Sequence, residues 1–225
     1  MKGIKAWPEN ERPRERLIQK GGAHLSDAEL LAVLLRGGLP GKDVIQLSHE
    51  LIADFGGWRG LLAAGPEALK RVKGLGPAKI ATLLSAAEIA RRHLREEVIG
   101  KSYLRDPQAV VDYLYGSLRD RKTEVFKVLF LNKSNRIVDE ADLFHGTVDE
   151  TAVHCREVVK AALERHATAL ILVHNHPSGR IQPSAEDREI TEKLKAACGA
   201  VSVKVLDHVI IGDNQHFSFT EHNLL

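Results

Sequence analysis

Two histidines and an aspartate stand at a spacing that could hold a metal ion. His174 and His176 follow an apolar run, and Asp187 comes after ten intervening residues. Because side chains alternate along a strand, residues at positions i and i+2 project from the same face. Two imidazoles and one carboxylate, with a fourth position open, form the ligand set of a catalytic zinc site. The spacing therefore predicts that these three residues bind one zinc ion.

The elements that must position these residues can be read from the surrounding sequence. The apolar run at 170–173 predicts a short buried strand that ends at the histidines. Pro177-Ser178-Gly179 predicts a turn. Ser184 and Asp187 fit the N-cap and N3 positions of a capping box, so a helix is expected to start there. A cap alone would also explain Asp187, and both interpretations stay open.

The combined pattern resembles a known family. HxHx(10)D, from His174 to Asp187, matches the JAMM metallopeptidase motif, and HNHPSG, PSxxD and LDHVIIG (206–212) resemble its RadC (UPF0758) branch. The resemblance covers the whole chain. It implies a C-terminal α/β/α JAMM-type (MPN+, cytidine-deaminase-like) mixed sheet that binds zinc and hydrolyses a peptide or isopeptide bond.

A hydrolytic zinc site needs a base, and Glu124 is the candidate. It precedes an apolar segment, 125–131, that should form a strand beside the metal strand. JAMM enzymes place their catalytic glutamate before such a strand, so the resemblance implies this role for Glu124. It also implies that Ser184 assists a developing oxyanion. Without the histidines, Glu124 would be read as an exposed residue at a strand edge.

The remaining polar residues of this region are expected to be structural. Asn175 and Ser178 are interpreted as loop-shaping residues. His145, His154, His208 and His216 each stand alone, as hydrogen-bonded structural histidines usually do. Asp207-His208 is interpreted as a packing feature or as a support for the metal ligands. The absence of HExxH and PCxxC argues against a zincin and a zinc deaminase.

Composition is that of a globular protein. Of 225 residues, 44% are hydrophobic and 28% charged, and 5% aromatic content argues against a base-stacking single-strand binder. No apolar run approaches the roughly 20 residues of a membrane span, and no secretory signal is seen. Cys155 and Cys198 fall in predicted helices and are expected to be reduced, buried thiols. We therefore expect a cytoplasmic protein without membrane contact.

The first 100 residues predict a separate helical domain. Residues 1–16 are polar and rich in Pro, Arg and Glu, which favours an extended arm. Helices are predicted at 26–36, at 44–55 and from 66. Gly74-Leu75-Gly76 then joins a short helix to a long one that reaches residue 93, and the pattern resembles a helix-hairpin-helix motif.

That hairpin raises the question of nucleic acid. Residues 1–100 carry 16 Lys and Arg against 12 Asp and Glu, an excess that the rest of the chain lacks. Gly74 and Gly76 would let the backbone approach a phosphate, with Lys73 and Lys79 adding counter-charge. The expected contact with DNA is weak and non-specific. The alternative is a helical hairpin that only packs.

Residues 101–225 predict the sheet domain, with a boundary at 98–103. Helices alternate with strands, which favours an α/β/α layered sheet. Helices are predicted at 106–118, 152–166 and 184–197, and strands at 123–131, 136–143, 170–173, 201–205, 209–211 and 216–219. The inner side of the 152–166 helix is expected to include Val158 and Leu163.

The function predicted from these features is zinc-dependent hydrolysis of a peptide or protein substrate. Two rivals remain. A metal-dependent nuclease is suggested by the hairpin and by HxH sites in phosphoesterases, although two-metal chemistry would need more ligands. The other rival is a nucleic-acid-associated adaptor, labelled as DNA repair, whose metal domain has no catalytic role. The oligomeric state is left open.

Overall fold

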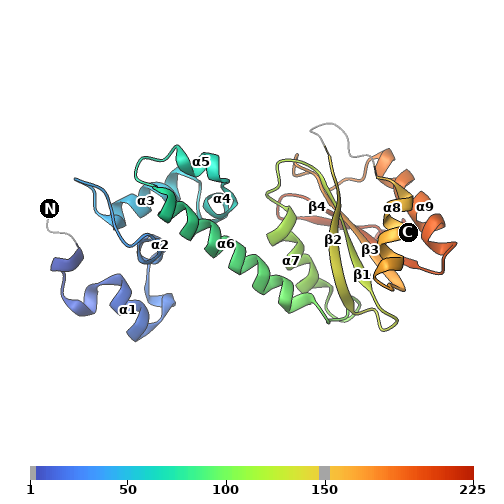
Figure 1. The fold of residues 1–225 in the computed structure, drawn as a ribbon, viewed down its shortest axis with the longest axis horizontal. Helices are drawn as coiled ribbons and strands as arrows, with labels where there is room; N and C mark the ends of the chain where they lie inside the picture. The colour runs from blue at the N-terminus through green and yellow to red at the C-terminus, as the bar shows by residue number, and fades with distance from the viewer. Residues whose placement is uncertain (1–3, 147–152) are drawn as a thin grey trace. The chain divides into compact units, whose positions relative to one another are not determined.

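The computed structural model describes residues 4–146 and 153–225 (Figure 1). They form two compact units, Met1–Ala90 and Arg91–Leu225, here called the N-terminal and C-terminal units. The division at Ala90 falls inside helix α6 (Pro77–Val98), whereas the sequence placed the boundary after that helix. Within the described ranges, no helix is both long and apolar enough to cross a membrane.

The N-terminal unit is entirely helical in its described part. Leucines on the inward faces of its helices form the core, including the fully buried Leu31, Leu51 and Leu69. The α-helices of this unit are α1 (Pro13–Lys20), α2 (Asp27–Leu35), α3 (Val44–Asp54), α4 (Trp58–Ala63), α5 (Pro66–Lys70) and the first part of α6, with 3-10 helices η1 (Ile4–Ala6), η2 (Glu9–Glu11) and η3 (Gly22–His24).

The predicted extended arm at 1–16 is wrong for the residues that the structure describes. Two 3-10 helices and the start of α1 occupy this segment. Pro13 stands at the first helical position, where its fixed φ and missing N–H are tolerated, and Arg12 is extended just before it. The polar composition of this segment favoured an extended chain, whereas Pro13 indicated the start of a helix. Residues 1–3 of the predicted arm lie outside the described part.

The C-terminal unit is built on one mixed sheet of order β2-β1-β3-β4-β5. β1 pairs antiparallel with both β2 and β3, β3 pairs parallel with β4, and β4 pairs antiparallel with β5. The site described below therefore starts from strands at the centre of the sheet. The strands are β1 (Val125–Leu131), β2 (Ile137–His145), β3 (Ala169–Asn175), β4 (Lys204–Ile211) and β5 (His216–Ser218).

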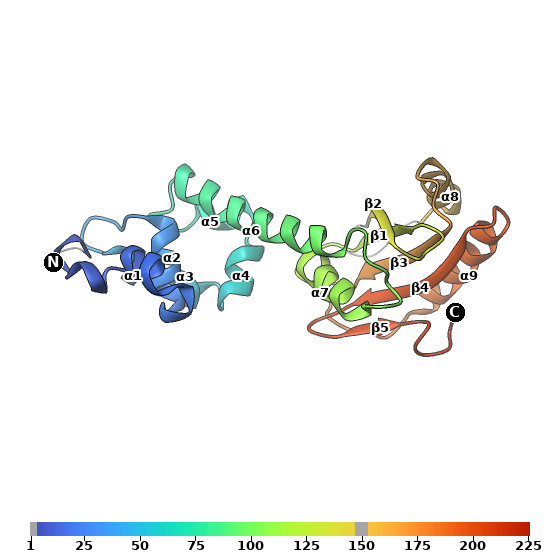
Figure 2. The ribbon, with the colours of Figure 1, turned by 90° about the horizontal axis from the view of Figure 1, so that it is seen from below.

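Helices cover both faces of this sheet, which confirms the predicted α/β/α fold class (Figure 2). Alternation along β1 decides which side chain meets which helix. Leu129 and Leu131 pack with α7 (Pro107–Leu118) on one face. Val128 and Phe130 pack with α8 (Cys155–Glu164) and α9 (Ala185–Gly199) on the other. Both faces of β1 are thus buried.

Strand β4 differs from the prediction. The sequence predicted two strands, 201–205 and 209–211, separated by a polar pair, but a single strand runs from Lys204 to Ile211. The polar pair lies inside it, beside a register shift in its pairing with β3. Its side chains are buried and hydrogen-bonded, so the strand continues through them.

Helix α8 also departs from the prediction in detail. It begins at Cys155, and Ala152, where the sequence placed its start, lies outside the described residues. Leu163 is 50% exposed and not on the inner side, whereas Val158 is fully buried. Both cysteines are free and helical, but only Cys198 is buried, because Cys155 lies at the helix start and is half-buried.

Candidate metal centre

Strand β3 delivers the two histidines to one place. His174 is its penultimate residue and is buried, and His176 follows directly after the strand. The N–H of His176 donates to the carbonyl of Ile211 at 3.0 Å, which keeps the chain extended beside β4. Both rings therefore leave the same face, as predicted, and their Nε2 atoms lie 2.9 Å apart.

Helix α9 supplies the carboxylate from its first turn. Asp187 Oδ1 lies 3.0 Å from His174 Nε2, and Oδ2 lies 3.5 Å from His176 Nε2. The capping box predicted for Ser184 and Asp187 is present. The backbone N–H and the hydroxyl of Ser184 each donate to Oδ2 at 2.8 Å, and the N–H of Asp187 donates back to the hydroxyl oxygen at 3.0 Å. The cap thus holds one carboxylate oxygen and leaves Oδ1 facing the histidines.

Glu124 completes the group from the start of β1. That strand lies beside β3, as predicted, with Phe126 opposite His174. Glu124 Oε1 is 3.8 Å from His174 Nε2, and its side chain is 28% exposed. One donor atom from each of Glu124, His174, His176 and Asp187 lies within 4.8 Å of all the others. The four side chains are a candidate metal-binding group.

The hydrogen bonds of His176 assign its tautomer. Its Nδ1 lies 2.9 Å from the carbonyl oxygen of Arg180. A carbonyl oxygen can only accept, so Nδ1 carries a proton, and in the neutral ring the lone pair is on Nε2, which faces the group. This is the form in which a histidine binds a metal ion.

A chain of hydrogen bonds assigns the tautomer of His174 in the same way. The hydroxyl of Thr191 donates to the carbonyl of Asp187, so it accepts from His208 Nδ1 at 2.6 Å. His208 Nε2 must then accept from His174 Nδ1 at 2.8 Å. In the neutral ring of His174 the lone pair is then on Nε2, and burial supports this direction of the chain because it lowers the pKa of His208 well below its usual value.

The acid–base properties of Asp187 suit a ligand. Burial would raise the pKa of its carboxyl group, but hydrogen bonds and charge from His174 and His176, with the Ser184 N–H, lower it well below its usual range. Burial lowers the pKa of His176, but its hydrogen bond to Asp187, the charge of that carboxylate and its bond to the Arg180 carbonyl together more than offset this, so the net shift is upward. These shifts belong to the metal-free group, in which a ring that donates from Nε2 to the carboxylate carries an extra proton; a bound metal ion would take the place of that proton.

Behind the group lies a buried carboxylate that motif spacing gives no way to find. Asp207 accepts four hydrogen bonds, from the hydroxyls of Tyr103 and Ser218 and from the N–H groups of His208 and Thr220. These bonds anchor β4 where His208 must face His174. The interpretation of Asp207-His208 as a support for the ligands agrees with these contacts. The signal in the sequence was the polar pair inside an apolar strand.

Comparison with known proteins identifies the family. The family model described as a RadC-like JAB domain matches residues 104–224, and that of the UPF0758 N-terminal region matches residues 4–81. A UPF0758 protein of Polaromonas sp. (strain JS666 / ATCC BAA-500) is 50% identical over 222 residues, 99% of each chain. One of Shewanella sp. (strain W3-18-1) is 49% identical over 219 residues, 97% of each chain. The chain belongs to the RadC family.

In this RadC family member, three of the histidines that were expected to be structural are not members of the metal-binding group. They are His145, His154 and His216. His216 Nδ1 lies 3.5 Å from the hydroxyl of Tyr115, and the ring of His154 lies edge-on to Phe144. Across residues 4–146 and 153–225, the group at Glu124 is the one cluster of three or more side chains suited to a metal ion.

The hairpin of the RadC N-terminal unit is partly covered by its own chain. A Cβ on Gly74, whose φ is +102°, would come within 2.5 Å of the Leu39 side chain. Lys79 Nζ donates to the carbonyls of Gly38 at 3.3 Å and Gly74 at 3.1 Å. Lys73 and Gly76 remain exposed. Contact with DNA through this turn stays a prediction, and Lys73 is the lysine left open to solvent.

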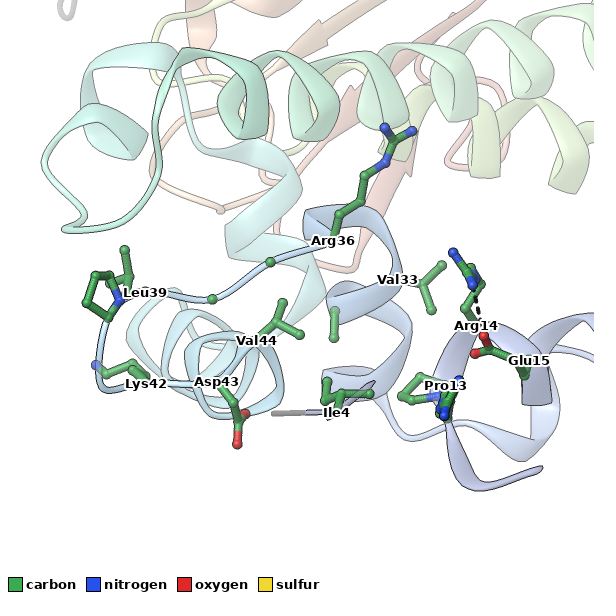
Figure 3. Close-up of a pocket in the computed structure, with 15 residues that line it drawn as sticks. Ile4, Pro13, Arg14, Glu15, Val33, Arg36, Leu39, Lys42, Asp43 and Val44 are labelled. Carbon is green, nitrogen blue, oxygen red and sulfur yellow. Dashed lines mark hydrogen bonds and ion pairs between the residues drawn. The ribbon is translucent and has the colours of Figure 1, made fainter. Parts of the chain in front are cut away.

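The N-terminal unit also contains a pocket of about 1070 Å³ (Figure 3). It lies between the start of α1, the end of α2 and the loop that leads to α3. Of its basic side chains, Arg14 pairs with Glu15, and Lys42 pairs with Glu50. Its lining residues do not include the metal-binding group, so this pocket and the candidate metal centre are in different units.

Proposed function

We propose that this RadC family member is a zinc-dependent hydrolase that cleaves a peptide or isopeptide bond. One observation carries the proposal: His174 Nε2 lies 2.9 Å from His176 Nε2 and 3.0 Å from Asp187 Oδ1, His176 Nε2 lies 3.5 Å from Asp187 Oδ2, and the Glu124 carboxylate is beside them. A tetrahedral zinc ion with bonds of roughly 2.0–2.1 Å needs about 3.3 Å between ligand atoms. The three donors match those edges and leave a fourth position.

The zinc ion, when bound, would supply Lewis acidity and lower the pKa of a bound water. Glu124 is proposed to accept the proton of that water and to deliver it to the leaving amine. Its place at the rim of the group, farther from His174 Nε2 than Asp187 is, suits a base that touches water and not the ion.

Of the two roles open to Ser184, orientation of the proposed ligand Asp187 is proposed as its main one. Its hydroxyl uses both its proton and a lone pair in the cap with Asp187. The proposed donation to a developing oxyanion requires the hydroxyl to turn away from Oδ2. Orientation of Asp187 requires no rearrangement.

The rival functions account for fewer of these features. A two-metal nuclease would need a second set of ligands near the first, and the described residues offer one group. A non-catalytic adaptor would have no use for a carboxylate at the position of Glu124. The bond cleaved is inferred from the JAMM resemblance, and the proposed cytoplasmic location from the free thiols.

The test is a pair of variants compared with the wild-type chain. Glu124→Gln keeps the shape but cannot accept a proton, so zinc content should survive while turnover falls by roughly 10²–10⁴-fold. Asp187→Asn should lose zinc. Metal content is measured first, and activity is then compared on peptide, isopeptide and duplex DNA substrates. Stoichiometric zinc in a His174→Ala, His176→Ala double variant would refute the metal centre.

A further inference from the structure

The residue between the two histidines is buried and makes contacts that a loop-shaping role does not explain. Asn175 is fully buried at the end of β3. Its Oδ1 accepts from the N–H of Val125 at 2.9 Å. Its Nδ2 faces the carbonyls of Thr123 at 3.2 Å and Arg121 at 3.4 Å. The side chain of Asn175 therefore hydrogen-bonds to the backbone on both sides of Glu124.

These contacts replace the ladder between two strands. Backbone pairing of β1 with β3 ends at Phe126 and His174. At the next position, the amide of Asn175 takes the hydrogen bond that a backbone carbonyl would otherwise accept. Its own backbone pairs on the other side, with Ile211 of β4. The side chain of Asn175 on β3 is thus hydrogen-bonded to the first residue of β1, Val125, and to the chain before Glu124.

The amide is suited to this task because it carries both an acceptor and two donors. Aspartate would face the two carbonyls with an oxygen, and serine would not reach them. The carbonyl of Glu124 itself is held from the other strand, by the N–H of Gly146 at 2.8 Å. With both neighbours and its own carbonyl fixed, the backbone of Glu124 has little freedom to move its carboxylate away from the histidines.

We propose that Asn175 is a positioning residue for Glu124, which it holds at the metal group through Thr123 and Val125. The inference rests on the proposed function, because that function gives Glu124 its role as base. Asn175 lies between two ligands but contributes no donor atom to the group. Its loss should therefore displace the base and spare the metal.

Acetohydroxamate tests this without a known substrate. Its two oxygens chelate zinc, and its hydroxyl proton must pass to a neighbouring base. Dissociation constants are measured on the zinc-loaded full chain, with zinc content determined for every variant. Asn175→Ala should weaken binding by about tenfold, the effect of losing one hydrogen bond to a charged group. Glu124→Gln should weaken it at least as much.

The double variant separates positioning from general damage. If Asn175 acts through Glu124, then Asn175→Ala added to Glu124→Gln causes no further loss. Asn132 is the matched control, because its Oδ1 also accepts two backbone N–H groups, in the turn between β1 and β2. Asn132→Ala should leave the affinity for acetohydroxamate unchanged.

The outcomes point to different failures. Wild-type affinity in Asn175→Ala, additive losses in the double variant, or loss of zinc from Asn175→Ala would each overturn the positioning role. Wild-type affinity in Glu124→Gln would instead overturn the proposed base. If Asn175→Ala does not fold, Asn175→Ser takes its place, and faster hydrogen exchange at the Val125 amide is its expected mark.

Discussion

The two oxygens of Asp187 have different partners, so the two interpretations that its sequence context left open are compatible. Oδ2 accepts from Ser184 as part of the helix cap, while Oδ1 faces His174. A cap and a metal ligand are compatible because a carboxylate has an oxygen for each. The capping box then serves to orient the ligand.

Ser184→Ala should therefore have two effects. Loss of the cap should lower the free energy of unfolding by about 0.5–2 kcal/mol. Loss of the bond to Oδ2 should also weaken zinc affinity roughly tenfold or more. Ser26→Ala is the control, because Ser26 and Glu29 form the same capping box on α2. Thermal unfolding and zinc titration of both variants check this. Equal zinc affinities of Ser184→Ala and Ser26→Ala would contradict the proposed role of Ser184 in orienting Asp187.

His208 should matter to zinc although it does not contact the proposed ion. His208→Phe keeps a ring in the buried site but removes the acceptor of the His174 proton and the donor to Thr191. We expect zinc affinity to fall by about 10–100-fold. His216→Phe, which removes a histidine bonded outside the centre, should leave it unchanged. Competition with a chromogenic chelator measures both affinities.

Sequence reasoning selected the proposed ligands and named Asp207-His208 as a candidate support, but it could not give the partners of the supports, for a physical reason. His174, His176 and Asp187 lie close together in sequence and have the residue types that a metal requires. Asn175 and His208 act through partners that tertiary structure brings to them, from β1 and α9. No spacing rule could pair them.

At the scale of elements, the errors arose where polarity was taken to end a strand or prevent a helix. Asp207 and His208 would ordinarily interrupt a buried strand, yet β4 continues because each is hydrogen-bonded inside the fold. Strands β1 and β3 were easier to predict, since a central strand that is buried on both faces is a nearly continuous run of apolar residues.

The hairpin gives a prediction at this scale, because its two lysines differ in their contacts. Lys79→Met should lower the stability of the N-terminal unit by about 1–3 kcal/mol, since it removes two hydrogen bonds to backbone carbonyls. Lys73→Met, at an exposed position, should leave that stability unchanged. It should instead reduce the weak, salt-sensitive retention on duplex DNA that we predict. Thermal unfolding and DNA retention at several salt concentrations separate the two. Absence of retention at low salt would mean that the hairpin only packs.

On the scale of the whole molecule, the chain carries its own probe for each unit. Both tryptophans, Trp7 and Trp58, lie in the N-terminal unit, and all three tyrosines lie in the C-terminal unit. The four side chains of the metal group also belong to the C-terminal unit. The two kinds of chromophore therefore report on a unit with the metal and a unit without it.

Removal of zinc should accordingly change the unfolding temperature that is monitored by tyrosine and not the one that is monitored by tryptophan. At free zinc of about 100 times its dissociation constant, binding stabilises the folded unit by about 2.7 kcal/mol. A chelator should lower the tyrosine-monitored unfolding temperature by roughly 10 °C and leave the tryptophan-monitored one unchanged. Equal shifts of both signals would show that the metal stabilises the chain as a whole.

The placement of the metal group has a consequence for how the chain folds. Glu124 precedes β1, His174 lies near the end of β3 and Asp187 lies in the first turn of α9, so the members of the group meet only after distant segments have paired. Closing those loops costs entropy that strand pairing must offset before an ion could bridge the residues. A zinc finger, by contrast, folds around its ion. In this chain, capture of the proposed metal would follow synthesis through Asp187 and assembly of the central strands.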